Sequence, residues 1–233
     1  MLRKFIVTVP VCALIASTFV QPLLAQQEPN LQTVEQQAAY AIGLSIGQNL
    51  KENGAQVDVR LIAFGIQHAL NGQKPLLTDE QAGQAMQEFQ RLTMERLGDA
   101  NAIKGLEFLA QNKTKPDVQT LPSGLQVKVL KSGDGPTPTR EHQVQAHYRG
   151  TFIDGEEFDS SYGRGEPSTF PVTGVIAGWT EALLRMKVGD KWQLFVPSEL
   201  AYGAQGRPGI PPHATLIFEV ELVAIEEEAL PKE

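Results

Sequence analysis

The spacing of apolar residues changes near residue 113, and this change constrains the fold more than any other feature of the chain. From Thr33 to about Asn112 apolar residues recur every three or four positions, which is typical of amphipathic helices. Beyond the polar, proline-bearing stretch 113–122 they alternate with polar residues, as in half-buried antiparallel strands. The chain is therefore predicted to be α+β, with a helical region followed by a β-rich domain.

Three helices are predicted before residue 113. Thr33 with Gln36, and Thr78 with Gln81, form capping boxes at the start of the first and third helices, and Asp58 begins the second. Asn-Gly pairs end the first two helices. At the α-helical rise the third helix would be about 50 Å long, so it carries more apolar positions than its two short neighbours can cover.

A stripe of small residues runs along the first helix. Ala39, Gly43 and Gly47 recur every four residues, and each interior glycine destabilises a helix by roughly 1 kcal/mol relative to alanine. The stripe therefore favours close packing of another helix, and three helices alone form too small a core to bury their apolar faces. We expect a homodimer held by residues 31–95. The neighbouring apolar stripe consists of Val34, Ala38, Ile42, Ile46 and Leu50.

The β-rich part is predicted to be a curved antiparallel sheet wrapped around one short helix. In the segment 142–150, Val144, Ala146 and Tyr148 share one face. Residues 179–186 are short enough for a single helix between strands. The other expected strands lie near residues 124–131, 168–173, 191–196 and 216–222.

The N-terminus has the pattern of a secretory signal peptide over residues 1–25. Arg3 and Lys4 precede an apolar run over 5–20. The run is shorter than the roughly 20 residues of a spanning helix, so we expect export to the periplasm or cell envelope, or secretion, without a stable membrane anchor. Cleavage would remove Cys12, the only cysteine, which excludes a disulfide framework and thiol catalysis.

Several function classes lack their sequence signatures. The formal net charge is −7 and no basic tract is present, so a nucleic-acid partner is not expected. The four histidines have no metal-ligand spacing, and neither a Gly-x-Ser-x-Gly turn nor a phosphate-binding loop occurs. No metal and no cofactor is therefore expected. The sequon at Asn112 is too short to predict glycosylation by itself.

Six short blocks occur in order in the β-rich part. They are Ala-His-Tyr-Arg-Gly at 146–150, Gly-Glu-Glu-Phe-Asp-Ser-Ser at 155–161, Val-Ile-Ala-Gly-Trp at 175–179, Val-Gly-Asp-Lys at 188–191, Ala-Tyr-Gly at 201–203 and Gly-Ile-Pro-Pro-His-Ala-Thr-Leu-Ile-Phe at 209–218. In this order they make residues 115–226 similar to an FKBP-type peptidyl-prolyl cis–trans isomerase domain. With the signal peptide and helical region, the chain resembles the exported bacterial subgroup of the macrophage infectivity potentiator (Mip) and its periplasmic relatives.

The resemblance implies a division of the chain into four parts and a dimer whose isomerase domains are splayed apart. The parts are a signal peptide (1–25), a helical dimerisation region ending in a long linker helix (26–112), an FKBP-type isomerase domain (113–226) and an acidic tail (227–233).

The resemblance also implies a site for a proline ring. Trp179 would form its floor, Tyr202 would donate a hydrogen bond to the substrate carbonyl, and Asp159 would lie at the rim facing the carbonyl that rotates. Ser168 stands where the small eukaryotic members carry another phenylalanine, which lowers one wall. Tyr148 and Phe218 complete the residues expected to act in catalysis. The other residues expected to bind substrate are Phe158, Arg164 as a partner of Asp159, Phe170, Val175, Ile176 and, as a cover from a loop, Ile210.

The implied reaction is rotation about X–Pro bonds. Rotation breaks no covalent bond but must cross roughly 18–20 kcal/mol, because amide resonance is lost. An apolar, dry site favours the twisted amide, since it has less charge separation than the planar one. Proline-containing unfolded or partly folded polypeptides would be the substrates, and macrolides that mimic proline would be inhibitors.

Other interpretations remain open at the level of sequence. Taken singly, Trp179, Phe158 and Phe218 are more typical of a plain core, and Asp159 followed by two serines fits a simple turn. A second function of the same pocket would be a chaperone that captures proline segments, with incidental turnover. A third interpretation makes the helical region purely an assembly device.

Overall fold

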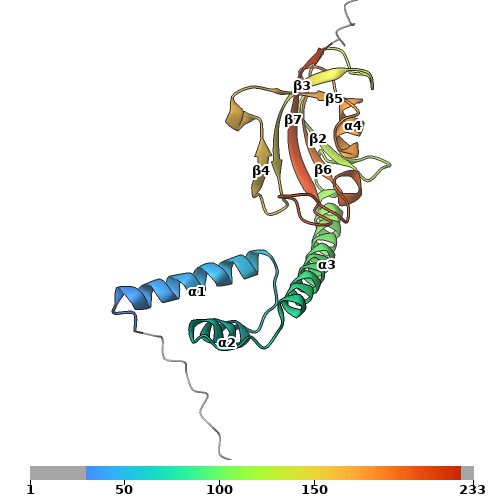
Figure 1. The fold of residues 1–233 in the computed structure, drawn as a ribbon. Coiled ribbons are helices and arrows are strands. Elements are labelled where there is room, and N and C mark those ends of the chain that lie inside the picture. Colours follow the sequence, from blue (N-terminus) through green and yellow to red (C-terminus); the bar gives the residue numbers. More distant parts are fainter. Residues whose placement is uncertain (1–29, 227–233) are drawn as a thin grey trace, which may run out of the picture. The chain divides into compact units, whose positions relative to one another are not determined.

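The computed structural model describes residues 30–226, and Figure 1 shows their arrangement into helices and strands. The signal peptide predicted for residues 1–25 and the acidic tail 227–233 lie outside the described residues. The chain divides into two units between Ser45 and Ile46, so each element is described from its own contacts.

Three helices precede the sheet, as predicted. They are α1 (Val34–Glu52), α2 (Val59–Leu70) and α3 (Asp79–Asn112). The Thr33 and Thr78 hydroxyls accept hydrogen bonds from the backbone N–H groups of Gln36 and Gln81 at 3.3 and 3.2 Å, and Asp58 caps α2. Each cap satisfies a backbone donor that the first turn of a helix leaves without a partner, which is why these helices begin where the sequence predicts.

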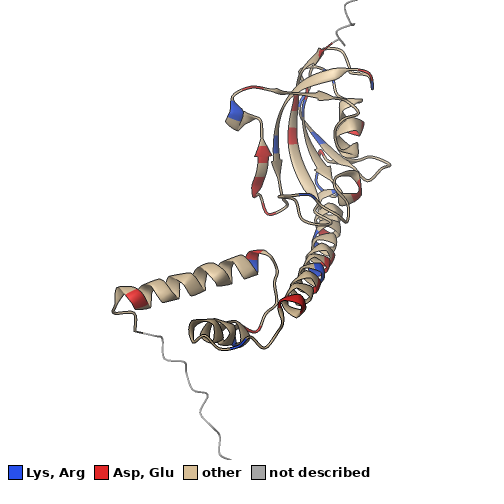
Figure 2. Cartoon of the chain, viewed as in Figure 1, with Lys and Arg blue, Asp and Glu red and all other residues tan. Residues whose placement is uncertain are grey.

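The apolar side chains of α1 and α2 lie on the surface of the single chain. No residue of either helix is buried, and Ile42, Leu61 and Leu70 are 62%, 69% and 82% exposed. A Cβ added at Gly43 or Gly47 would meet no atom within 4 Å. Figure 2 shows few charged residues on these two helices. Their apolar and small-residue stripes are therefore uncovered in the part of the chain that the structure describes.

The second half of α3 packs against the β-rich domain. Its buried positions there are Gly98, Gly105 and Asn112. A Cβ at Gly105 would collide with the side chain of Thr215, and the amide of Asn101 donates to the carbonyl of Pro212 at 2.9 Å. The helix extends as far as predicted. Its last turns are not a free linker, because they pack against the β-rich domain.

The β-rich domain is one antiparallel sheet with the strand order β1-β2-β6-β7-β3-β4, and β5 also pairs with β3. Its strands are β1 (Gln119–Thr120), β2 (Gln126–Lys131), β3 (Gln143–Thr151), β4 (Glu157–Ser160), β5 (Ser168–Pro171), β6 (Lys191–Val196) and β7 (Leu216–Glu226). A short helix, α4 (Ala177–Leu183), approaches β6 so closely that a Cβ at Gly178 would overlap Val196. The predicted α+β fold, a curved sheet around one short helix, is confirmed (Figure 1).

The core lies between the sheet and α4. The predicted alternation on β3 is confirmed, because Val144, Ala146 and Tyr148 are all buried. On β7 the buried side chains are Leu216, Phe218, Val220 and Leu222. Strands β1 and β4, and the short 3-10 helices η1 (Tyr162–Arg164) and η2 (Ser198–Leu200), were not predicted. Strand β4 matters most, because it carries Phe158 and Asp159.

Candidate active site

Aromatic rings gather around Trp179 at the start of α4. The indole is 4% exposed. Its ring centroid lies 5.4 Å from Tyr148, 5.6 Å from Phe170 and 5.4 Å from Phe218, with interplanar angles of 80°, 76° and 88°. Phe158 meets Phe218 in the same edge-to-face manner at 5.6 Å. Edge-to-face packing is the favoured geometry for aromatic pairs, so the cluster presents a rigid, apolar surface.

The remaining expected wall and cover residues belong to the same apolar cluster. Val175, Ile176 and Tyr202 are partly buried and pack against it, and Ile210 is 3% exposed within it. Two reciprocal backbone hydrogen bonds of 2.8 Å join Ile210 to Arg207. The guanidinium of Arg207 in turn lies 4.7 Å from the ring centroid of Tyr202. The structure thus brings together the apolar residues that the resemblance implied.

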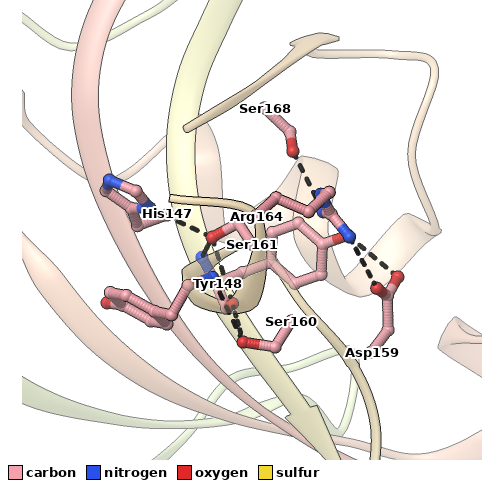
Figure 3. A network of polar contacts seen from close by, with 8 residues as sticks. His147, Tyr148, Asp159, Ser160, Ser161, Arg164 and Ser168 are labelled. Atoms are coloured by element: carbon pink, nitrogen blue, oxygen red, sulfur yellow. Dashed lines mark hydrogen bonds and ion pairs between the residues drawn. The ribbon is translucent and has the colours of Figure 1, made fainter. Parts of the chain in front are cut away.

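Polar side chains surround the phenol of Tyr148, as Figure 3 shows, and the Tyr148 ring also packs on Trp179 in the aromatic cluster. The phenol of Tyr148 donates to Asp159 Oδ2 at 2.8 Å and accepts from Arg164 Nη2 at 2.9 Å. Arg164 Nη1 donates to Asp159 Oδ1 at 3.3 Å, so the implied pairing of these two residues is present. The same guanidinium donates to Ser168 Oγ at 3.2 Å. Because the ion pair is exposed to solvent, it orients the carboxylate more than it stabilises the fold.

The phenol of Tyr148 is held in its protonated form. Burial raises the pKa of Tyr148, the hydrogen bond from Arg164 opposes this, and the bond to Asp159 raises it further. A phenol with a pKa above its ordinary value of about 10 keeps its proton at neutral pH. It can therefore donate continuously to Asp159 and fix the direction of that carboxylate.

Two residues beside this group were not predicted to serve the site. Ser161 is fully buried, and His147, expected only as part of the polar face of its strand, stacks on Tyr162 with ring centroids 4.9 Å apart. The available signal was their position within the blocks at 146–150 and 155–161, next to expected site residues. Nothing in the residue types alone indicated that they contact each other.

Two other kinds of feature are absent from residues 30–226. These residues contain no cluster of three or more His, Cys, Asp or Glu side chains arranged to hold a metal ion. Over the same range, no helix combines the length and apolarity that crossing a membrane requires.

Two family models match the chain. The model of FKBP-type peptidyl-prolyl cis-trans isomerases matches residues 135–223, which contain every residue of the aromatic cluster and its polar border. A second model, described as the domain amino terminal to FKBP-type peptidyl-prolyl isomerase, matches residues 35–129 and so covers α1 from its second residue, together with α2 and α3.

Similar proteins extend this match over most of the chain. The FKBP-type 22 kDa peptidyl-prolyl cis-trans isomerase of Escherichia coli K12 is 44% identical over 203 residues, which cover 84% of this chain and 98% of the relative. The outer membrane protein MIP of Legionella longbeachae is 38% identical, over 98% of this chain and 100% of its own. The crystal structure of FkpA from Escherichia coli aligns with a TM-score of 0.65 and 38% identity, covering 84% of this chain and 99% of FkpA. Because the family models, the sequences of these relatives and the fold all match, the chain belongs to the FKBP-type peptidyl-prolyl cis-trans isomerases and is an enzyme of that activity.

Proposed function

We propose that X–Pro bonds rotate against the aromatic cluster around Trp179, with Asp159 and Tyr202 contacting the peptide at its edge. The observation that carries this proposal is the junction of a buried, edge-to-face aromatic cluster with the Tyr148–Asp159–Arg164 hydrogen-bonded group. One part suits an apolar proline ring, and the other suits a carbonyl dipole.

In this proposal catalysis comes from the environment that the pocket offers to the amide. The proline ring packs on Trp179, between walls formed by Phe158, Phe170 and Phe218 together with Val175 and Ile176. Removing the amide from water favours the twisted state, because charge separation falls as resonance is lost. Tyr202 donates to the substrate carbonyl that stays fixed, while Asp159 faces the carbonyl that rotates. Since no covalent bond is made or broken, the mechanism needs no nucleophile or proton transfer.

The role of Asp159 can be tested by one substitution. Asp159→Ala is expected to lower kcat/KM for a short X–Pro peptide by roughly tenfold to a hundredfold, the scale of losing one positioned polar group. Folding should persist, because the carboxylate is partly solvent-exposed. Coupled isomerisation of peptides with apolar residues before proline is the measurement, and Tyr202→Phe should also slow it.

Asp154→Ala is the matched control, since Asp154 is an exposed carboxylate in the turn after β3. Its carboxylate accepts from the Glu156 backbone N–H at 3.1 Å, a contact that stays within this exposed turn. Asp154→Ala should therefore leave kcat/KM within about twofold of the unsubstituted chain. Full activity of Asp159→Ala would show that the assignment of Asp159 is wrong.

We also propose that the pocket binds macrolides such as tacrolimus or rapamycin as proline mimics. The low wall at Ser168 should make binding weaker than in the small eukaryotic members, because a phenylalanine there would add apolar contact. Calorimetric titration is the measurement, and Ser168→Phe is expected to tighten binding by about tenfold. Absence of both heat and inhibition at micromolar protein would contradict this prediction.

The cellular setting proposed is the cell envelope. Its support is the signal-peptide pattern of residues 1–25 together with a relative that bears the name outer membrane protein MIP. The clients would be exported proteins whose folding waits for proline isomerisation, which takes tens to hundreds of seconds without catalysis. The chain would act there as a homodimer formed by residues 31–95.

A further inference from the structure

We infer that Ser161 and His147 are positioning residues that hold Tyr148, and through it Asp159, in the geometry that isomerisation requires. This inference rests on the proposed function, because it assumes that Asp159 acts on the substrate. Neither side chain belongs to the apolar cluster around Trp179, and Figure 3 shows both beside the backbone of Tyr148.

On one side, strand β3 has no strand partner at Tyr148. Along this side β3 pairs with β5 from Gln143 to Ala146 and with β4 from Arg149 to Thr151. Tyr148 lies between these two stretches and pairs with neither strand. Because Tyr148 is only 7% exposed, an unpartnered backbone N–H or carbonyl there would be unfavourable.

Ser161 supplies the missing hydrogen-bond partners of the Tyr148 backbone. Its backbone N–H donates to the Tyr148 carbonyl at 2.9 Å, and its hydroxyl accepts from the Tyr148 backbone N–H at 2.8 Å. Ser161 directly follows β4, where the chain turns into η1, so its side chain replaces the strand partner that β4 no longer supplies. The hydroxyl is fully buried, and therefore water is not a ready substitute.

His147 completes the hydrogen bonding of this hydroxyl. The Ser161 Oγ lies 3.1 Å from His147 Nδ1 and 3.2 Å from the Tyr148 carbonyl oxygen. A serine hydroxyl has one hydrogen and two acceptor positions. All contacts are satisfied together when His147 carries a hydrogen on Nδ1 and donates it, while Ser161 donates to the carbonyl. We assign that tautomer to His147, because it satisfies every contact of the Ser161 hydroxyl. Its stacking on Tyr162, with 9° between ring planes, fixes the ring orientation.

The anchored segment leads directly to the catalytic carboxylate. Asp159 lies two residues before Ser161, and its carboxylate accepts the 2.8 Å hydrogen bond from the Tyr148 phenol. Ser161 therefore connects the end of β4 to the backbone of Tyr148. The Tyr148 side chain in turn holds Asp159. Loss of this connection would let the carboxylate shift, and misplacement of a catalytic group by about 1 Å can lower a rate a hundredfold.

Adjacent serines give a matched test. Ser161→Ala is expected to lower kcat/KM for a short X–Pro peptide in the full chain by about tenfold, mostly through kcat. Ser160→Ala is the control, because the Ser160 hydroxyl contacts the same carbonyl only at 3.4 Å, and its other hydrogen bond, accepted from the Tyr162 backbone N–H at 3.2 Å, does not involve Tyr148. It should change kcat/KM by less than about twofold.

A second pair of variants tests the inference without touching the buried serine. His147→Asn keeps an N–H donor near the Nδ1 position and should retain most of the activity. His147→Phe keeps the stacking on Tyr162 but loses the donor, so it should show a loss similar in direction to Ser161→Ala. These variants keep the inference testable if Ser161→Ala does not fold.

A double-mutant cycle separates positioning from simple structural support. If Ser161 acts through Asp159, the Asp159→Ala/Ser161→Ala variant should be no slower than Asp159→Ala alone. Losses that multiply in the double variant would overturn the inference, as would full activity of Ser161→Ala or, if that variant does not fold, of His147→Phe. If Asp159→Ala itself were fully active, the proposed function of Asp159 would fail and this inference with it. Loss in Asp159→Ala without loss in Ser161→Ala would instead overturn this inference alone.

Discussion

Replacing Trp179 with alanine is expected to lower the free energy of unfolding of the isomerase domain by about 3–5 kcal/mol and to remove most catalysis. Trp179 is 4% exposed, and three aromatic rings meet it within 5.6 Å. Truncation would leave a cavity that these rings cannot close without giving up their edge-to-face contacts. Urea unfolding followed by circular dichroism, together with the peptide assay, measures both losses.

Trp179→Phe separates the two effects. In the part of the chain that the structure describes, the indole N–H of Trp179 is buried without a hydrogen-bond partner, and phenylalanine would remove that unsatisfied donor. We therefore expect it to retain more of the folding free energy than Trp179→Ala while still losing kcat/KM. Trp192→Ala on β6 is the control for loss of an indole, because Trp192 lies outside the expected site. A Trp179→Ala variant with unchanged kcat/KM would contradict the assignment of the pocket floor.

Local signals in the sequence predicted the elements that local chemistry controls. Capping boxes depend on side chains three residues apart, so Thr33 with Gln36 and Thr78 with Gln81 marked helix starts correctly. Alternation on β3 predicted which face is buried, because successive side chains of a strand point in opposite directions. The α+β fold followed from joining these two kinds of pattern.

Features that depend on contacts between distant segments were not predicted. Strand β4 is four residues long and starts with an acidic residue, so alternation gives little signal there. The packing of α3 was not predicted, because its buried positions are small or polar residues that do not stand out in an apolar pattern: Thr93, Gly98, Gly105 and Asn112. The interval of seven residues between Gly98, Gly105 and Asn112 was the available clue. The contact of Ser161 with Tyr148 spans 13 residues, and no periodicity reports it.

The site residues likewise divide into those that the sequence predicted and those that it did not. The aromatic cluster was predicted because ordered blocks placed Tyr148, Trp179 and Phe218 in a known family arrangement, and geometry now brings their rings together. Trp179 taken singly would not have predicted a site, since a buried tryptophan is more typical of a core. The pairing of Arg164 with Asp159 was also predicted from the resemblance. The hydrogen bonds of Ser161 with Tyr148 and His147 were not, because they depend on the backbone direction at one position of β3.

The exposed faces of α1 and α2 make dimerisation the remaining prediction with a large effect. Side chains such as Ile42 and Leu61 are more than half exposed, and Gly43 and Gly47 leave room for a close-packed helix. Charged residues are scarce there (Figure 2), as in the buried centres of protein interfaces. Contiguous apolar faces of this kind are unusual on a soluble monomer, and a second copy of the same chain offers a matching surface.

Residues 26–233 are therefore expected to sediment at twice the monomer mass, and Ile42→Asp with Ile46→Asp to sediment as a monomer. Burying two aspartates in an apolar interface is unfavourable unless they are paired. Gln48→Asp is the control, because Gln48 lies on the opposite side of the helix from Ile46.

Activity on short peptides should stay within about twofold in the monomeric variant, because the substituted side chains lie outside the isomerase site. Refolding of a proline-limited protein should slow by about tenfold or more, since two linked pockets raise the effective concentration for a second contact. Removing residues 26–95 should act the same way, because it leaves the α3 contacts of Gly98, Asn101 and Gly105 with the β-rich domain in place. A single species of monomer mass for residues 26–233 across micromolar concentrations would refute the dimer.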